Sequence, residues 1–202
     1  TYEEYCAFIA SAGADLIMFD DDYHNYHGGV KSEPGLGEEE HISVPGCFCD
    51  DHRKIFNKLH PELDFDEVKN KFWTDNEYKK AYLETLGEPL YEFARRVRNA
   101  VDKVNPKVRI GICGHPADYF INGIEPIKLA KILAGDTKPF MRLIGAPYWD
   151  YFSGYPDRLS SVIELERRQT EYLKNSDIEF FVEGDTYPRP RWTCPSANLE
   201  CF

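Results

Sequence analysis

Features that would assign the chain to several broad classes are missing from its 202 residues. No apolar run approaches the roughly 18 residues that a membrane-spanning helix requires, and no signal peptide is recognisable. Basic residues form no cluster longer than Arg95-Arg96-Val97-Arg98, and the net charge is −11. The composition therefore argues against nucleic acid and membrane surfaces as partners. Six cysteines are too few for a disulfide scaffold in a chain of this length.

The length is that of one domain with a sizeable core. We expect residues 1–202 to be a single domain and an incomplete piece of a longer protein, because the chain starts at Thr1 and residues 197–202 resemble the start of a helix. Missing ends would hide any signal peptide, so the sequence leaves open a cytoplasmic or a secreted location. It also leaves open whether the protein forms a homo-oligomer.

A short apolar run leads directly into three aspartates. Residues 15–19 have the character of a buried parallel strand, and Asp20, Asp21 and Asp22 follow them. Ligands of α/β proteins bind at the carboxyl ends of strands, and adjacent carboxylates raise the pKa of at least one of their number. The run predicts a functional site at this strand end.

Strand-like and helix-like segments alternate along the chain. Strands are predicted over residues 15–19, 108–113, 140–145 and 178–183, and the main helices over 2–13, 76–104, 124–134 and 159–175, the second with a break at 87–89. This alternation predicts an α/β fold with a parallel sheet and right-handed crossovers. Because the later strands are about one βα unit apart, we expect half of a (β/α)₈ TIM barrel. The rival, a doubly wound sheet, lacks a Gly-rich phosphate loop.

Apolar residues recur at helical spacing in two of the predicted helices. In the first helix they are Tyr5, Phe8, Ile9 and Ala12. In the long helix they form one stripe that we expect to be buried: Leu90, Phe93, Ala94, Val97, Ala100, Val101 and Val104.

Residues 46–52 contain a second cluster of reactive side chains. Cys47, Cys49 and His52 have the residue types and spacing to face one tetrahedral zinc ion, with His41 as a candidate fourth ligand. The alternative is a pair of reduced, unliganded thiols. A sulfur-rich zinc site would staple the long loop of residues 21–50 and would take no part in catalysis.

Carboxylates follow both the first and the fourth predicted strands. Glu183 ends the fourth strand, and it would face the aspartates of the first strand across a cleft. Two opposed carboxylates are what glycoside hydrolysis needs. The alternative for Glu183 is a structural ion pair with Arg189 or Arg191.

Two motifs give the chain a resemblance to the family 42 β-galactosidases of glycoside hydrolase clan A. Asp20-Asp21-Asp22-Tyr23 resembles that family's Asp-Asn-Glu-Tyr motif, and Cys47-Phe48-Cys49-Asp50-Asp51-His52 resembles its Cys-aromatic-Cys-x-x-Cys zinc motif. The resemblance implies that the chain supplies strands four to seven of a catalytic barrel. It also implies a structural zinc ion and no cofactor for catalysis.

On this resemblance Asp22 is the proton donor and Glu183 the nucleophile of a retaining enzyme acting on a carbohydrate. Asp22 stands where the family has Glu, and Asp21 where it has Asn, so the acid is shorter by one methylene. Candidates for holding sugar hydroxyls are Asp20, Asp21, His115, Tyr148, Trp149, Asp185 and Arg189. Two alternatives stay open: a metal-dependent carbohydrate deacetylase, suggested by Phe19-Asp20-Asp21, and a carbohydrate-binding barrel without turnover.

Overall fold

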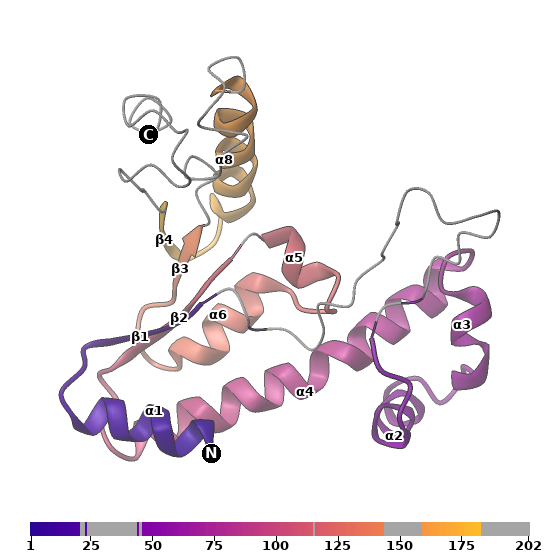
Figure 1. Ribbon diagram of the computed structural model, residues 1–202, viewed down its shortest axis with the longest axis horizontal. Coiled ribbons are helices and arrows are strands. Elements are labelled where there is room, and N and C mark those ends of the chain that lie inside the picture. The colour runs from indigo at the N-terminus through magenta and orange to yellow at the C-terminus, as the bar shows by residue number, and fades with distance from the viewer. Residues whose placement is uncertain (21–22, 24–43, 45, 115, 144–158, 183–202) are drawn as a thin grey trace, which may run out of the picture.

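The computed structural model describes residues 1–20, 23, 44, 46–114, 116–143 and 159–182 of the chain (Figure 1). In chain order the elements are α1 (Tyr2–Ser11), β1 (Leu16–Phe19), α2 (Asp50–Leu59), the 3₁₀ turn η1 (Phe65–Glu67), α3 (Val68–Lys71), α4 (Asn76–Asp102), β2 (Arg109–Cys113), α5 (Pro116–Phe120), α6 (Pro126–Ala134), β3 (Phe140–Leu143), α8 (Leu159–Leu173) and β4 (Glu179–Val182). Each predicted strand and each main predicted helix is present. None of the helices in the described ranges is both long and apolar enough to cross a bilayer.

The four strands form one parallel sheet in the order β1-β2-β3-β4. Phe19 pairs with Ile112, Cys113 with Arg142, and Arg142 with Phe181. Strands that are consecutive in sequence are neighbours in the sheet, and because all of the pairings are parallel, their carboxyl ends lie along the same edge. The predicted parallel α/β fold is confirmed at this level.

Alternation along the strands gives the sheet two different faces. The face that we call the helix face carries the apolar side chains that pack into one core with α4 and α6: Ile17, Ile110, Ile112, Met141 and Leu143. The register places a different set on the opposite face, here called the distal face: Met18, Arg109, Gly111, Cys113, Phe140, Arg142, Glu179 and Phe181. Charged residues near both ends of the strands are therefore on the distal face.

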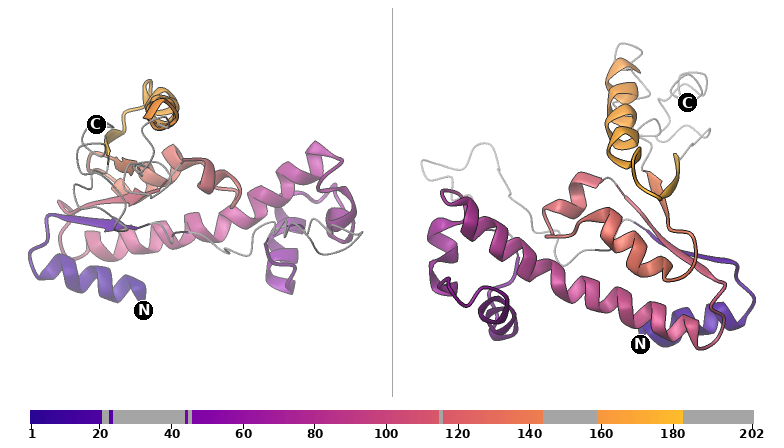
Figure 2. Two further views of the ribbon diagram at one scale, coloured as in Figure 1. Left: turned by 45° about the horizontal axis from the view of Figure 1, so that its top comes forward. Right: turned by 180° about the vertical axis from the view of Figure 1, so that it is seen from behind.

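Helix α1 lies alongside the C-terminal half of α4 (Figures 1 and 2). Its buried residues are Cys6 and Ala10, whereas Tyr5 and Phe8 are 60% and 68% exposed. The apolar residues at helical spacing are therefore not the buried ones: Tyr5, Phe8 and Ala12 are exposed, and Ile9 is half-buried. Two small side chains four residues apart let the helices approach closely, and that contact determines which side of α1 is covered.

Helix α4 runs without interruption for 27 residues, although Pro89 lies inside it. The predicted break at residues 87–89 is wrong. Proline removes one helical hydrogen bond, but buried side chains hold the helix on both sides of it, among them Tyr82 and Tyr91. Ala94, Val97 and Val101 are buried as predicted, whereas Val104 lies beyond the helix end and is 46% exposed.

A second hydrophobic core lies at the N-terminal end of α4, away from the sheet (Figure 1). It joins α2, η1 and α3 to the first turns of α4 through Phe56, Phe65, Val68, Phe72, Tyr78, Ala81, Tyr82 and Leu86. Half-buried Phe48, from the segment that precedes α2, packs against it. The segment between β1 and α4 thus builds a small helical unit with its own core.

Candidate functional site

The carboxyl edge of the sheet contains an ion pair that spans three strands. Arg142 of β3 donates through Nη2 to Asp20 Oδ1, 2.8 Å away, directly after β1. The same guanidinium donates through Nε to Cys113 Sγ of β2, also at 2.8 Å. The side chains of Arg142 and Asp20 are 20% and 70% exposed. Asp20, a predicted substrate ligand, is therefore held in place at a solvent-accessible edge.

The opposite end of the distal face has a comparable pair. Arg109, at the start of β2, donates through Nη1 to Glu179 Oε1 at 3.1 Å, and its guanidinium lies 5.0 Å from the centre of the Phe140 ring. The hydrogen bond to Arg109 is the main reason that the pKa of Glu179 lies below its usual value. Lys138 adds a second cation at 3.6 Å from Glu179. The pair of Arg109 and Glu179 thus lies at the amino end of the strands, and the pair of Asp20 and Arg142 lies at the carboxyl end.

Tyr23 is anchored three residues after Asp20. Its hydroxyl donates to the carbonyl oxygen of Leu90 in α4 at 2.6 Å, and its ring contacts Phe19 and Phe93. The side chain is buried, and burial raises the pKa of Tyr23 well above its usual value, so the hydroxyl stays a donor.

Most of the other predicted strand-end residues lie outside the described residues. These are the predicted catalytic pair, Asp22 and Glu183, and the predicted sugar ligands Asp21, His115, Tyr148, Trp149, Asp185 and Arg189. Their positions in the sequence relate them to described strands. Asp21 and Asp22 lie between Asp20 and Tyr23, and Glu183 directly follows Val182, the last residue of β4.

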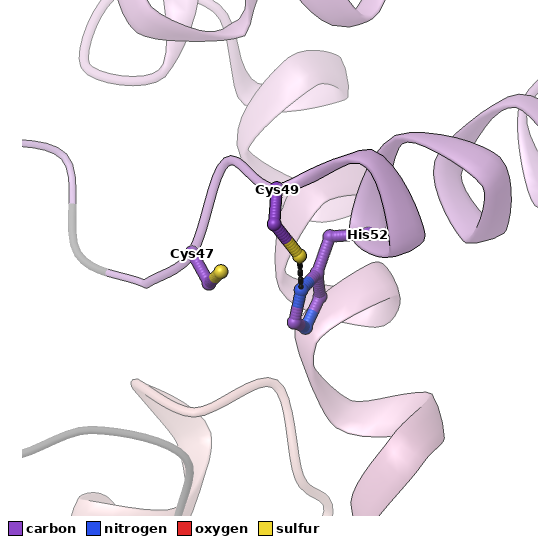
Figure 3. Close-up of side chains that lie close together, drawn as sticks. All are labelled: Cys47, Cys49 and His52. Atoms are coloured by element: carbon purple, nitrogen blue, oxygen red, sulfur yellow. Dashed lines mark hydrogen bonds between the residues drawn. The ribbon is translucent and has the colours of Figure 1, made fainter.

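The Cys47, Cys49 and His52 side chains come together at the start of α2 (Figure 3). One candidate ligand atom from each lies within 4.8 Å of the others. Cys49 is the N-cap of α2 and His52 lies in its first turn, so a single turn of helix brings the two side chains to the same side. The predicted metal-ligating residues are therefore gathered in space.

Phe48 fixes the segment that carries both cysteines. Its ring stacks on Tyr82 with a centroid separation of 4.8 Å and contacts Phe65 at 5.7 Å. The Tyr82 hydroxyl donates to the carbonyl oxygen of Cys47 at 3.2 Å. Because Phe48 points into the second core, the flanking cysteines are left at the surface.

Hydrogen bonds at the helix start lower the pKa of the Cys49 thiol to about 6. The backbone N–H of His52 contributes most, followed by the His52 side chain and the Cys47 side chain. Cys49 Sγ lies 3.3 Å from His52 Nδ1 (Figure 3). The thiolate is the form of cysteine that binds metals, so the structure favours the reactive form at neutral pH.

One separation within this cluster fits a shared zinc ion. Two ligands of one tetrahedral zinc, with bonds of about 2.0–2.3 Å, are separated by roughly 3.3–3.8 Å, and the 3.3 Å between Cys49 Sγ and His52 Nδ1 lies in that range. The other ring nitrogen of His52, Nε2, is buried and has no hydrogen-bond partner among the described residues. Among the described residues, no hydrogen bond from Nε2 therefore ties the His52 ring to another helix or strand. Cys47, Cys49 and His52 would be three of the zinc ligands, and His41 lies outside the described residues.

Sequence reasoning missed Arg142 as part of the edge site. Its partner Asp20 is 122 residues away in the chain, and only the strand register brings the two together. The signal in the sequence is the arginine itself. Placing a charged side chain within the apolar strand Phe140–Leu143 is unfavourable unless a carboxylate pairs with it.

No protein-family model, no curated protein and no solved structure matches this chain.

Proposed function

We propose that the protein is a retaining glycoside hydrolase, similar to the family 42 β-galactosidases, built on a (β/α)₈ barrel to which this chain contributes four units. The observation that carries the proposal is the parallel sheet in sequential order, with Asp20 and its arginine at the carboxyl edge. Barrels of this kind have consecutive strands as neighbours and their active site at that edge.

Strand alternation supports the assignment of the two catalytic acids. Asp22 is two residues beyond Asp20, and Glu183 is two residues beyond Phe181. Because side chains alternate with a period of two, the proposal puts both carboxylates on the distal face, which would be the inside of the barrel. They follow β1 and β4, the outer strands of this sheet, so a cleft between them could hold a sugar.

Under this proposal each acid has one role. Asp22 donates a proton to the leaving oxygen, and Glu183 attacks the anomeric carbon to form a glycosyl-enzyme intermediate that water then hydrolyses. Asp20, Asp21, His115, Tyr148, Trp149, Asp185 and Arg189 are proposed to hold sugar hydroxyls. The proposed partner is a carbohydrate substrate, and its hydrolysis by this mechanism requires no cofactor.

Hydrolysis of a panel of aryl glycosides, galactosides included, by the full-length protein tests the proposal. We expect the Glu183→Gln variant to lose at least about a thousandfold in kcat, because it removes the nucleophile. The Glu179→Gln variant is the matched control. It lies four residues earlier, at the amino end of β4, and should remain within a few-fold of the parent.

Other outcomes would point to the alternatives. Absence of aryl glycoside hydrolysis, together with chelator-sensitive release of acetate from an acetylated saccharide, would favour a metal-dependent deacetylase. Saccharide binding without product release would favour a binding barrel.

We also propose that Cys47, Cys49 and His52 hold a structural zinc ion. The 3.3 Å separation between Cys49 Sγ and His52 Nδ1 supports this assignment, as does the anchoring of Phe48 in the second core. We expect about one zinc per chain by elemental analysis and thiolate-to-metal absorption after cobalt substitution. Cys49→Ser should weaken that absorption strongly, because only the Cys47 thiolate remains, whereas Cys113→Ser, at a buried cysteine in β2, should preserve it. Equal metal content in the Cys49→Ser variant would contradict the assignment.

A further inference from the structure

Two described residues bracket the acidic segment at the end of β1. Asp20 is tied to Arg142 of β3, and Tyr23 is tied to the Leu90 carbonyl of α4. Between these attachments there are only two residues, Asp21 and Asp22. Asp20 and Tyr23 belong to one short stretch of chain but are held by two different elements.

Arg142 is well placed to hold Asp20. Its side chain extends across β2 to Asp20, and the hydrogen bond from Nε to Cys113 Sγ, at 2.8 Å, fixes the orientation of the guanidinium. Register supports the alignment: Cys113 pairs with Arg142, and Asp20 follows the pair formed by Phe19 and Ile112. A charge-assisted hydrogen bond of this length is among the stronger ones in proteins.

Tyr23 supplies the second attachment by different means. Its ring is buried against Phe19 and Phe93, and its hydroxyl hydrogen bond at 2.6 Å satisfies a backbone carbonyl of α4. A buried aromatic side chain with a satisfied hydroxyl has little rotational freedom.

We propose that Arg142 and Tyr23 are positioning residues that hold the acidic end of β1 in its working orientation. The inference rests on the proposed function, in which Asp22 is the proton donor. Neither residue touches the substrate in this proposal; Arg142 acts through Asp20, and Tyr23 acts through the backbone. Because a misplacement of about 1 Å can cost a hundredfold in rate, two attachments this close to the acid matter for turnover.

The test uses two variants, each with a matched control in the full-length protein. Arg142→Gln removes the guanidinium at the carboxyl edge, and Arg109→Gln removes the equivalent ion pair at the amino edge. Tyr23→Phe removes the hydroxyl that bonds Leu90. Tyr82→Phe removes another buried hydroxyl that bonds a backbone carbonyl, in the second core.

The first readout does not depend on turnover. Backbone ¹⁵N relaxation should give order parameters near 0.85 for Asp20 and Tyr23 in the parent, falling below about 0.6 at Asp20 in Arg142→Gln and at Tyr23 in Tyr23→Phe. The two controls should keep the parent values. Order parameters that stay at the parent value in both test variants would overturn the inference, whatever the activity.

The second readout is the division of the effect between kcat and KM. We expect kcat to fall about 10- to 100-fold in each test variant, with KM within about threefold in Tyr23→Phe and raised in Arg142→Gln because Asp20 is also a proposed sugar ligand. Arg142→Lys should recover part of the loss. Lower order with an unchanged kcat would also overturn the positioning role. If the parent hydrolyses no glycoside while the order parameters behave as expected, the anchoring stands and the proposed function fails.

Discussion

At the scale of single residues, Phe48 shows how a hydrophobic side chain can build a polar site. It packs on Tyr82 and Phe65, and the cation of Lys69 lies 4.7 Å from the centre of its ring. The two cysteines on either side of it are consequently presented to solvent as a pair. Their spacing in the sequence predicts a metal site, but it does not show that the residue between them provides the anchor.

Removing that anchor should affect both stability and metal retention. We expect Phe48→Ala to lower the free energy of unfolding by about 2–3 kcal/mol, somewhat below the loss for a fully buried ring, because Phe48 is half-buried. If Cys47, Cys49 and His52 hold zinc as proposed, the metal should dissociate faster from this variant. Denaturant unfolding and chelator competition measure the two effects, with Phe181→Ala, in β4, as the control for loss of an exposed ring. Zinc release at the parent rate would show that Phe48 does not position the cysteines.

The low pKa of Cys49 predicts selective thiol chemistry in the metal-free protein. Above a pH of about 6 the Cys49 thiolate predominates, so alkylation at pH 7 should be faster at Cys49 than at Cys47, which is also exposed. Lowering the pH to 5 should protonate most of Cys49 and slow its reaction about tenfold. Peptide mapping by mass spectrometry after timed iodoacetamide treatment reports both rates. Equal rates at the two cysteines at pH 7 would contradict the hydrogen-bond pattern at the start of α2.

At the scale of elements, apolar periodicity predicts the existence of helices better than their packed faces. It predicts α1, yet large Tyr5 and Phe8 are exposed and small Cys6 and Ala10 make the contact with α4. Helix α4 continues through Pro89 because two cores hold its halves. Both differences arise from tertiary packing, which the spacing of apolar residues along one helix does not report.

Gly87 and Gly123 allow a close approach between the backbones of α4 and the turn before α6. A Cβ on Gly123 would lie 1.6 Å from the carbonyl oxygen of Leu83, and the residue has a positive φ of +72°. We expect Gly123→Ala to destabilise the protein by about 3 kcal/mol or more, since backbone must move. Urea unfolding measures the loss.

Gly13→Ala is the control for backbone conformation alone. Gly13 also has a positive φ, +93°, but a Cβ there would meet nothing within 4 Å. Its substitution should cost only about 1–2 kcal/mol. Similar losses at the two glycines would show that α4 and the turn are not in tight contact.

At the scale of the whole molecule, two cores share the long helix α4. The sequence predicts the α/β core through alternating strands and helices, and the structure confirms the parallel sheet. The second core is harder to predict from the sequence, because its aromatic residues come from short segments without a clear hydrophobic periodicity: Phe48, Phe56, Phe65 and Phe72. The register between distant strands, and with it the Arg142 to Asp20 pair, depends on tertiary structure alone.

Metal removal should act on one core and spare the other. If Cys47, Cys49 and His52 hold zinc, a chelator should increase amide hydrogen exchange in α2, η1 and α3 by about tenfold or more. Exchange in β2 and α6, which belong to the sheet core, should stay unchanged. Mass spectrometry resolves the two regions by peptide. A uniform increase over both would show that the cores unfold as one cooperative unit.

The most direct test of the central claim is covalent trapping of the nucleophile. A 2-deoxy-2-fluoro glycoside with an activated leaving group slows hydrolysis of the glycosyl-enzyme intermediate, so a retaining enzyme accumulates it. We predict that the full-length protein gains the mass of one fluoroglycosyl group and that peptide sequencing places it on Glu183. Label on another residue, or hydrolysis with inversion and no label, would contradict the assignment of Glu183 as the nucleophile of a retaining glycoside hydrolase.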